Sequence, residues 1–160
     1  MFGKIVILLG FLIGTHTAFA QDREKALGIW KLVSLEIEYQ TSGERRIPYG
    51  KDPKGYIIFT PEGRMMTVIT GEGRKPAKTD EDRAQLLRTM FAYTGTYRFE
   101  GDKFVTKVDA SWNEAWTGTE QVRFYKIAGN RLEIISAWAP ATNEPGEPQV
   151  RGLIVWERAQ

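Results

Sequence analysis

Three polar residues lie on one face of two predicted strands and could together bind an anion. With Gly129-Asn130 as the turn of a hairpin, Arg123 pairs with Ser136, and Gln121 follows on the same face. The positions of this face nearer the turn are Tyr125, Ile127, Leu132 and Ile134. A guanidinium can hold a carboxylate through two parallel hydrogen bonds. The pattern therefore predicts a site for a polar head group above an apolar interior.

Arg123 needs a partner if it is buried, because an unpaired charge inside a protein costs several kcal/mol even after relaxation. One candidate is Glu36, which shares a face of the first predicted strand with Trp30 and Leu32. The other candidate is the carboxylate of a ligand, bound with help from Gln121 and a tyrosine hydroxyl. The two hypotheses are compatible, because a salt bridge at the mouth of a cavity can be shared with a ligand.

Aromatic residues dominate the preceding predicted hairpin. With Gly101-Asp102 as its turn, the predicted inward pairs are Phe99 with Phe104, Tyr97 with Thr106, Gly95 with Val108 and Tyr93 with Ala110, and Trp112 continues the row. Such a row could hold the apolar body of a ligand. The predicted ligand-binding residues are Trp30, Glu36, Tyr56, Tyr97, Trp112, Gln121, Arg123 and Ser136.

The elements that must position these residues are short strands separated by turns. Thr60-Pro61-Glu62-Gly63 is a turn sequence, so Tyr56 to Thr60 and Arg64 to Thr70 form a further predicted hairpin. Its two faces are about equally apolar, so either could point inward. With Trp30 to Tyr39 and Gly152 to Arg158, the chain has about eight strands, which indicates an all-β sandwich or barrel.

A single helix is predicted between the strands. Thr79-Asp80-Glu81-Asp82 resembles a capping box at a helix start, and Ala84 and Leu87 follow on one face with Met90 and Phe91. We expect about three turns lying across an end or flank of the barrel, as a plug over apolar surface rather than a moving lid.

The first twenty residues have the pattern of a secretory signal peptide. Lys4 precedes an uninterrupted apolar run from Ile5 to Ile13, and Ala18-Phe19-Ala20 is a cleavage sequence. The run is shorter than the roughly 20 apolar residues that span a bilayer, so we expect no membrane anchor after cleavage. The predicted organisation is a signal peptide at 1–20 and one domain at 21–160, in a protein exported to the periplasm or the extracellular space.

Cleavage after Ala20 would also remove His16, the only histidine of a chain that has no cysteine. The mature chain would then lack Ser-His-Asp and Cys-His nucleophiles, imidazole or thiolate zinc sites and disulfides. We expect no metal and no cofactor. The formal charge is only +2, and Lys and Arg alternate with acidic residues, so no nucleic-acid partner is expected.

Several segments in order carry a resemblance to a known family. Gly28-Ile29-Trp30 resembles the G-x-W start of lipocalins, and four later segments are similar to the bacterial and fungal lipocalin-like domain family: 49–57, 92–97, 118–123 and 155–158. The resemblance implies an up-and-down antiparallel barrel of about eight to ten strands with an interior cavity. It also implies Trp30 near the closed end, with Arg158 packed on it. Members often carry a histidine on the strand that here reads Val105 to Asp109, and this chain has none.

Three hypotheses for the function follow. The first is an exported protein, monomeric or weakly dimeric, that binds a small, largely apolar molecule, with or without a carboxylate or other polar head group, in the barrel interior. The second is a histidine-independent isomerase, cyclase or dehydratase that uses Tyr56 or Tyr97 as acid, Glu36 as base and Arg123 as electrostatic stabiliser. The third is a non-enzymatic envelope protein with a solid barrel that acts through its outer surface.

Overall fold

The computed structural model describes residues 24–141 and 144–159. The predicted signal peptide therefore lies outside the described residues. The elements are β1 (Gly28–Tyr39), β2 (Arg45–Arg46), β3 (Lys54–Phe59), β4 (Arg64–Thr70), α2 (Asp80–Arg88), β5 (Met90–Glu100), β6 (Lys103–Ser111), the 3₁₀ helix η1 (Glu114–Trp116), β7 (Glu120–Ala128), β8 (Arg131–Ser136), β9 (Ala139–Pro140) and β10 (Gln149–Arg158).

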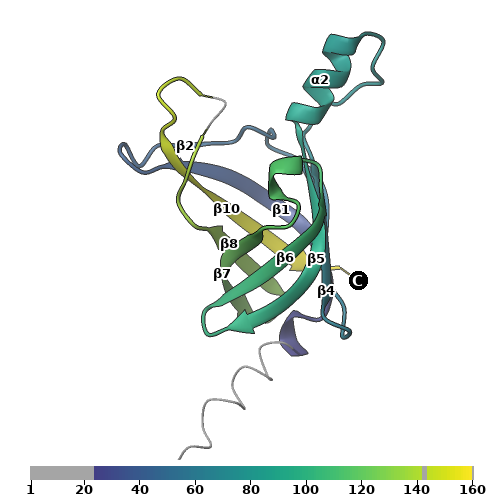
Figure 1. The fold of residues 1–160 in the computed structure, drawn as a ribbon, viewed down its shortest axis with the longest axis vertical. Coiled ribbons are helices and arrows are strands. Elements are labelled where there is room, and N and C mark those ends of the chain that lie inside the picture. The colour runs from purple at the N-terminus through teal and green to yellow at the C-terminus, as the bar shows by residue number, and fades with distance from the viewer. Residues whose placement is uncertain (1–23, 142–143, 160) are drawn as a thin grey trace, which may run out of the picture.

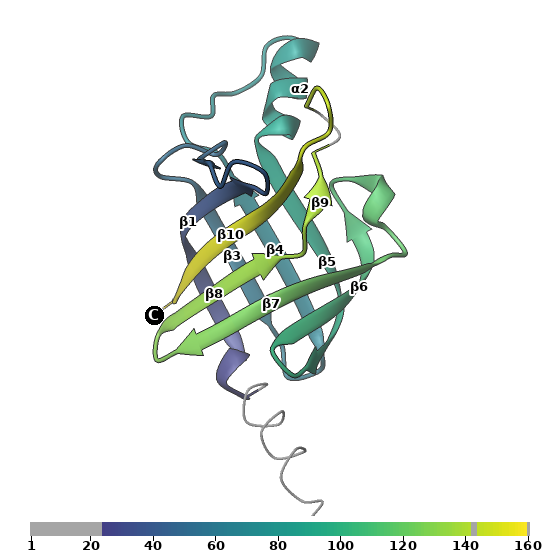
Figure 2. The same ribbon diagram turned by 90° about the vertical axis from the view of Figure 1, so that its left-hand side faces the viewer.

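The strands form one antiparallel sheet that closes on itself. Each strand from β3 to β8 pairs with its sequence neighbour, β8 pairs with β10, and β1 pairs with both β3 and β10 (Figures 1 and 2). The short strands β2 and β9 extend the sheet beside β1 and β10. Closure leaves the eight long strands without a free edge, and the predicted all-β barrel with one short helix is confirmed.

The hairpins follow the turn chemistry of the sequence. Gly101 and Gly129 have φ values of 65° and 57°, which a side chain rarely tolerates, and they set the registers of β5–β6 and β7–β8. Phe99 pairs with Phe104 and Arg123 with Ser136, as predicted. The hairpin of β3 and β4 turns Ile57, Phe59 and Met65 into the core.

One end of the barrel is filled by a dense core around Trp30, which is completely buried. Its indole nitrogen donates a hydrogen bond to the carbonyl of Ala26, 2.8 Å away. The guanidinium of Arg158 lies 4.1 Å from the ring centre of Trp30 and donates to the carbonyls of Leu27 and Lys25. The structure thus shows Arg158 on Trp30 at the closed end, as the resemblance implied.

Two β-bulges change which side chains face inward. In β1 the register shifts between Leu32 and Ser34, and Val33 becomes 43% exposed. Beyond the bulge Leu35 is buried and Glu36 is on the outside, so the predicted inward row is confirmed for Trp30 and Leu32 and is wrong for Glu36. The cause is one extra residue, which reverses the alternation of faces.

The second bulge lies between β5 and β6. Gly95 pairs with Val108 as predicted, but Thr94 pairs with Ala110 and Tyr93 with Ser111, so Asp109 is the extra residue. The predicted pairing of Tyr93 with Ala110 is therefore wrong. Any side chain at position 95 would collide with the Lys107 carbonyl. Because glycine has no side chain, Gly95 allows the two strands to approach closely here.

Helix α2 projects from the open end of the barrel instead of lying across it (Figure 1). Its capping box is present: Asp82 donates its amide to the Thr79 hydroxyl and accepts the Thr79 amide. None of its residues is buried, and Leu87 is 53% exposed. The predicted plug is therefore wrong, because Met90 and Phe91 belong to β5 and leave too short an apolar face to dock.

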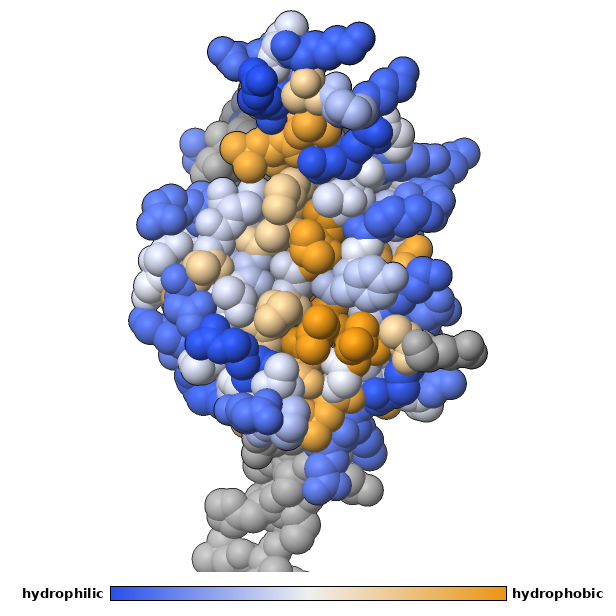
Figure 3. Space-filling model, turned by 90° about the vertical axis from the view of Figure 1, so that its right-hand side faces the viewer, coloured by the Kyte–Doolittle hydropathy of each residue, from blue (hydrophilic) through white to orange (hydrophobic). Residues whose placement is uncertain are grey.

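The outer surface carries apolar side chains on β1, β3 and β4. Ile29, Tyr56, Met66 and Val68 are each more than two-fifths exposed. Figure 3 shows apolar side chains gathered along one side of the barrel. Within the described ranges no helix is long and apolar enough to cross a membrane.

Candidate functional site

A cavity of about 350 Å³ opens at the end of the barrel opposite Trp30. Its wall is formed by β1, β5, β7, β8 and β10 with the loops above them. The lining residues are Leu35, Ile37, Tyr49, Phe91, Trp116, Glu120, Gln121, Val122, Arg123, Ser136, Ala137, Ala139, Val150, Arg151, Gly152 and Ile154. The size falls at the lower end of the range for small-molecule sites, which are mostly apolar with a few polar groups.

Arg123 is the most buried charged residue of the cavity wall, with only 7% of its surface exposed. Its Nη1 donates to the carbonyl of Val122 at 2.8 Å, and its Nη2 donates to Oε1 of Gln121 at 3.3 Å. Its guanidinium carbon lies 5.3 Å from the ring centre of Trp116 and 5.9 Å from that of Tyr93. Arg123 thus packs between two aromatic rings whose faces favour a cation.

Arg123 forms no ion pair within 24–141 and 144–159. The predicted salt bridge to Glu36 is wrong, because the bulge in β1 turns Glu36 outward, where it lies 3.5 Å from Arg45. A guanidinium has five N–H donors, and the bonds to the oxygens of Val122 and Gln121, with a further contact to the Tyr93 hydroxyl, still leave donors for another acceptor. The cavity therefore contains a buried positive charge that its surroundings only partly satisfy.

Tyr93 is buried beside this charge. Burial raises the pKa of the Tyr93 hydroxyl above its usual range, and the adjacent Arg123 guanidinium offsets part of that rise. The hydroxyl therefore remains protonated near neutral pH and can act as a neutral hydrogen-bonding group. Burial also raises the pKa of Tyr49, another tyrosine, which lines the cavity.

The polar groups on either side of Arg123 are held in place by other contacts. The Gln121 amide nitrogen donates to the Thr119 hydroxyl at 3.0 Å, which aims its oxygen at Arg123. The Ser136 hydroxyl donates to the Ala137 carbonyl and accepts the Gly152 amide at 2.8 Å. Ser136 therefore mainly joins β8 to β10, while Gln121 orients Arg123.

A second arginine lies at the mouth, but it is already paired. Arg151 donates to the Glu38 carboxylate and its guanidinium lies 4.5 Å from the ring centre of Trp138. The Glu38 side chain is only 13% exposed, and the hydrogen bond from Arg151, with help from Arg45, lowers its pKa. Because Arg151 is neutralised and Arg123 is not, the unpaired charge is at the inner part of the cavity.

The structure brings together three of the eight predicted site residues. Gln121, Arg123 and Ser136 line the cavity. Trp30 and Tyr97 are buried in the closed-end core, where the Tyr97 hydroxyl donates to the Thr60 carbonyl.

The other three predicted site residues lie elsewhere. Glu36 and Tyr56 are on the outer surface, so the proposed acid and base of an enzyme are not assembled with Arg123. Trp112 lies at the rim, with its ring 4.7 Å from Phe91 and 5.0 Å from Trp116. It contacts the aromatic wall from behind and does not line the cavity.

The predicted ligand-binding residues do not include Phe91 and Trp116, which form the aromatic wall above Tyr93. The sequence pattern predicts Phe91 on the helix and Trp116 in a rim loop, as a portal contact or a loop anchor. On a strand, Phe91 and Tyr93 are two positions apart and therefore share the inner face. Trp116 follows an irregular segment in which no periodicity applies. Asn113 caps η1 by accepting the Ala115 amide, and this turn directs Trp116 over the cavity.

Among the described residues, no group of three or more acidic, histidine or cysteine side chains could hold a metal ion. The cavity wall combines apolar side chains with a few polar groups, a composition typical of sites for organic molecules.

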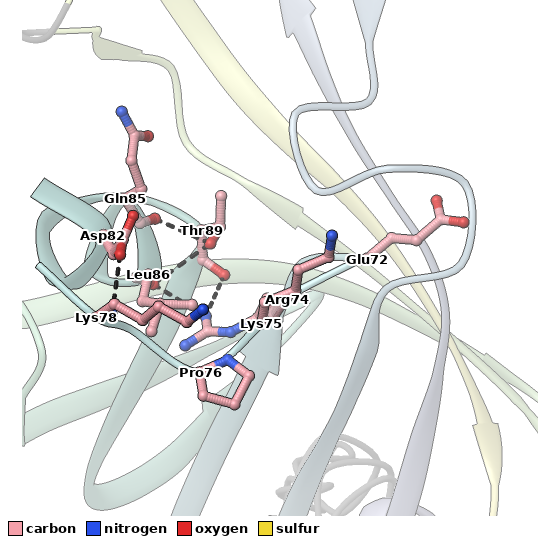
Figure 4. Close-up of a pocket in the computed structure, with 10 residues that line it drawn as sticks. Glu72, Arg74, Lys75, Pro76, Lys78, Asp82, Gln85, Leu86 and Thr89 are labelled. Atoms are coloured by element: carbon pink, nitrogen blue, oxygen red, sulfur yellow. Dashed lines mark hydrogen bonds between the residues drawn. The ribbon is translucent and has the colours of Figure 1, made fainter.

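A wider hollow of about 600 Å³ lies outside the barrel, between α2 and the loop before it (Figure 4). Arg74 crosses it and donates to the carbonyls of Leu86 and Thr89, which satisfies the C-terminal end of the helix. Lys75 and Gln85 on its walls are exposed. This hollow is explained by the way the loop supports α2.

The closed antiparallel barrel, solid at one end and hollow at the other, defines a lipocalin-like protein, an architecture that fits ligand binding. A family model for the lipocalin-like domain matches residues 27–159, and the chain belongs to this family. No curated protein matches the chain. The chain is similar to the crystal structure of an uncharacterized protein from Bacteroides eggerthii, with 12% identity, a TM-score of 0.41, and coverage of 84% of this chain and 99% of that one.

Proposed function

We propose that this protein binds a small, largely apolar molecule with a carboxylate group, and that Arg123 receives the carboxylate. The observation that carries the proposal is the burial of Arg123 without an ion pair in the described structure. Buried charges without a partner in the protein are rare, because no ion pair offsets the free energy that their desolvation costs. Such a charge therefore indicates a role in binding. A ligand carboxylate would supply both the opposite charge and acceptors in the matching planar geometry.

The remaining wall supports an apolar ligand body. Leu35, Ile37, Phe91, Val150 and Ile154 surround the space next to Arg123. A volume of about 350 Å³ is sufficient for a medium-chain fatty acid or a small aromatic acid. Burial of apolar surface would provide most of the affinity, while Arg123 would provide the preference for an acid.

The proposal includes export. A binding protein with an apolar cavity and a cleavable leader would meet its ligand outside the cytoplasm. The charged residues after Ala20 and the apolar run before it support this location. Expression of the full chain, followed by fractionation and N-terminal sequencing, should give a mature protein that begins at Gln21 in the periplasm or the medium.

Paired probes test the binding proposal: decanoate and decanol share a chain and differ in charge. We expect decanoate to quench the tryptophan fluorescence and to bind at least about tenfold more tightly than decanol, because a hydrogen bond to a charged group contributes roughly 1.5–3 kcal/mol. Arg123→Met should remove this preference. Arg131→Met, which removes an exposed arginine paired with Glu133 away from the cavity, is the matched control and should leave it intact.

The proposal fails if neither probe binds, or if Arg123→Met weakens both probes equally. Mass spectrometry provides an independent check, because a co-purified acid should be released when the protein is unfolded. An enzyme that uses Glu36 as base and Tyr56 or Tyr97 as acid is not supported, since none of these three residues lines the cavity. A solid barrel is likewise not supported, because the cavity is present.

A further inference from the structure

A small recess lies beneath the cavity, between the Arg123 side chain and the closed-end core. It measures about 10 Å³, and Thr67 and Trp156 are on its wall. Phe91, Arg123 and Ile154 line both the cavity and the recess. The recess is therefore the inner continuation of the cavity, with Arg123 between the two.

Two residues of the recess wall each contain a buried polar atom that lacks a hydrogen-bond partner in the described part of the chain. The hydroxyl of Thr67 and the indole nitrogen of Trp156 are inaccessible to solvent and form no hydrogen bond within the described part of the chain. Thr67 is 5% exposed and Trp156 is 1% exposed. Since buried polar groups are nearly always hydrogen-bonded, two orphans on one recess point to a guest that the protein chain does not supply.

The chemistry of the two groups defines this guest. An indole N–H can only donate, so the guest must be an acceptor, which excludes an ammonium group or a hydrocarbon. A hydroxyl can donate or accept, so it can pair with the same guest. The volume is at the threshold for one water-sized particle.

We propose that the recess binds one neutral oxygen atom, which accepts the Trp156 indole N–H and shares a hydrogen bond with the Thr67 hydroxyl. In the free protein this oxygen belongs to a water molecule. In the complex it belongs either to the same water or to a hydroxyl or carbonyl group of the ligand. The ligand part of this inference rests on the proposed function, whereas the site in the free protein does not.

The direction in which Thr67→Val changes the folding equilibrium constant tests whether the recess holds an oxygen atom. If an oxygen is bound, Thr67→Val removes one of its hydrogen bonds and should lower the folding equilibrium constant roughly fivefold or more. If the hydroxyl is a true orphan, the same change removes a buried unsatisfied group and should raise that constant. Thr106→Val is the matched control, because Thr106 is also buried and unpartnered but is not on the recess wall. It should leave the constant unchanged or raise it.

A spectroscopic measurement tests the site directly in the unaltered protein. The indole proton of Trp156 should show a nuclear Overhauser effect to a long-lived water in the ligand-free protein, and Thr67→Val should weaken it. Absence of this effect, together with a Thr67→Val variant at least as stable as the parent, would overturn the proposal.

Addition of decanoate and of 2-hydroxydecanoate, whose hydroxyl group is next to the carboxylate, distinguishes the two sources of the oxygen, because Arg123 lies between the cavity and the recess. The water signal should persist with decanoate, and its loss with the hydroxy acid alone would assign the oxygen to the ligand. Persistence with both would assign it to water. If neither acid binds, the proposed function fails. The water signal of the free protein still shows whether the recess holds a water molecule.

Discussion

The guanidinium carbon of Arg123 lies 5.3 Å from the centre of the Trp116 ring, and both side chains line the cavity. Arg123 comes from β7, while Trp116 comes from the 3₁₀ turn before it. The ring shields the charge from solvent without neutralising it, because a cation–π contact is weaker than an ion pair in the same surroundings. We therefore expect Arg123 to lower the stability of the free protein, and Arg123 and Trp116 together to favour the binding of an acid.

Arg123→Met should stabilise the free protein while it removes the preference for acids. A buried charge with no carboxylate partner costs more than an apolar side chain of similar length, so we expect a gain of about 1 kcal/mol or more in the free energy of unfolding. Urea denaturation of the ligand-free proteins measures the difference. A loss of stability would instead show that Arg123 is mainly structural, and Arg131→Met provides the surface reference.

Trp116→Ala should weaken the binding of decanoate by about tenfold, because the change removes apolar contact and exposes Arg123 to water. Trp112→Ala is the matched control. Trp112 touches Trp116 but does not line the cavity, so its loss should have the smaller effect. Isothermal calorimetry gives both affinities, and equal losses would contradict the assigned positions.

Glu36→Gln and Glu38→Gln should differ, although the residues are two positions apart in β1. Glu36 makes one ion contact at the surface, and its change should leave stability and binding almost unaltered. Glu38 is more buried and paired with both Arg151 and Arg45, so its change should destabilise the mouth. The arginines lower the pKa of Glu38, so the stability that it contributes is present above pH 4.5 and is lost as the pH falls. Thermal denaturation of the two variants at pH 7 and at pH 4 checks the ranking, and a larger effect at Glu36 would contradict it.

Tyr93 should titrate above pH 10, and Arg123→Met should move its pKa higher still, because the nearby positive charge favours the phenolate. The folded pKa exceeds the unfolded value of 10.0, so the unfolded chain loses its proton first. The free energy of unfolding should therefore decrease as the pH rises above 10. NMR of ¹³C-labelled tyrosine resolves this residue from the other five. A pKa that falls in the variant would show that the charge does not act on Tyr93.

The hairpin turns made much of the fold predictable. Gly101 and Gly129 specify tight turns, and each register then follows by pairing outward from the turn. The polar end of β7 could be predicted for the same reason, since Gln121 and Arg123 share a face at a known distance from Gly129. These inferences depend only on local geometry.

The sequence alone thus determined the barrel, the inward position of Arg123 and the closed end marked by Trp30. Tertiary structure decided which residues accompany Arg123. Bulges beside Val33 and Asp109 reverse the alternation of their strands, and no local signal marks where an extra residue will be accommodated. Glu36 therefore lies on the outer surface, and the residues that line the cavity with Arg123 include Phe91 and Trp116 instead. The physical reason is that barrel closure selects the bulges, through the twist and curvature that all strands must share.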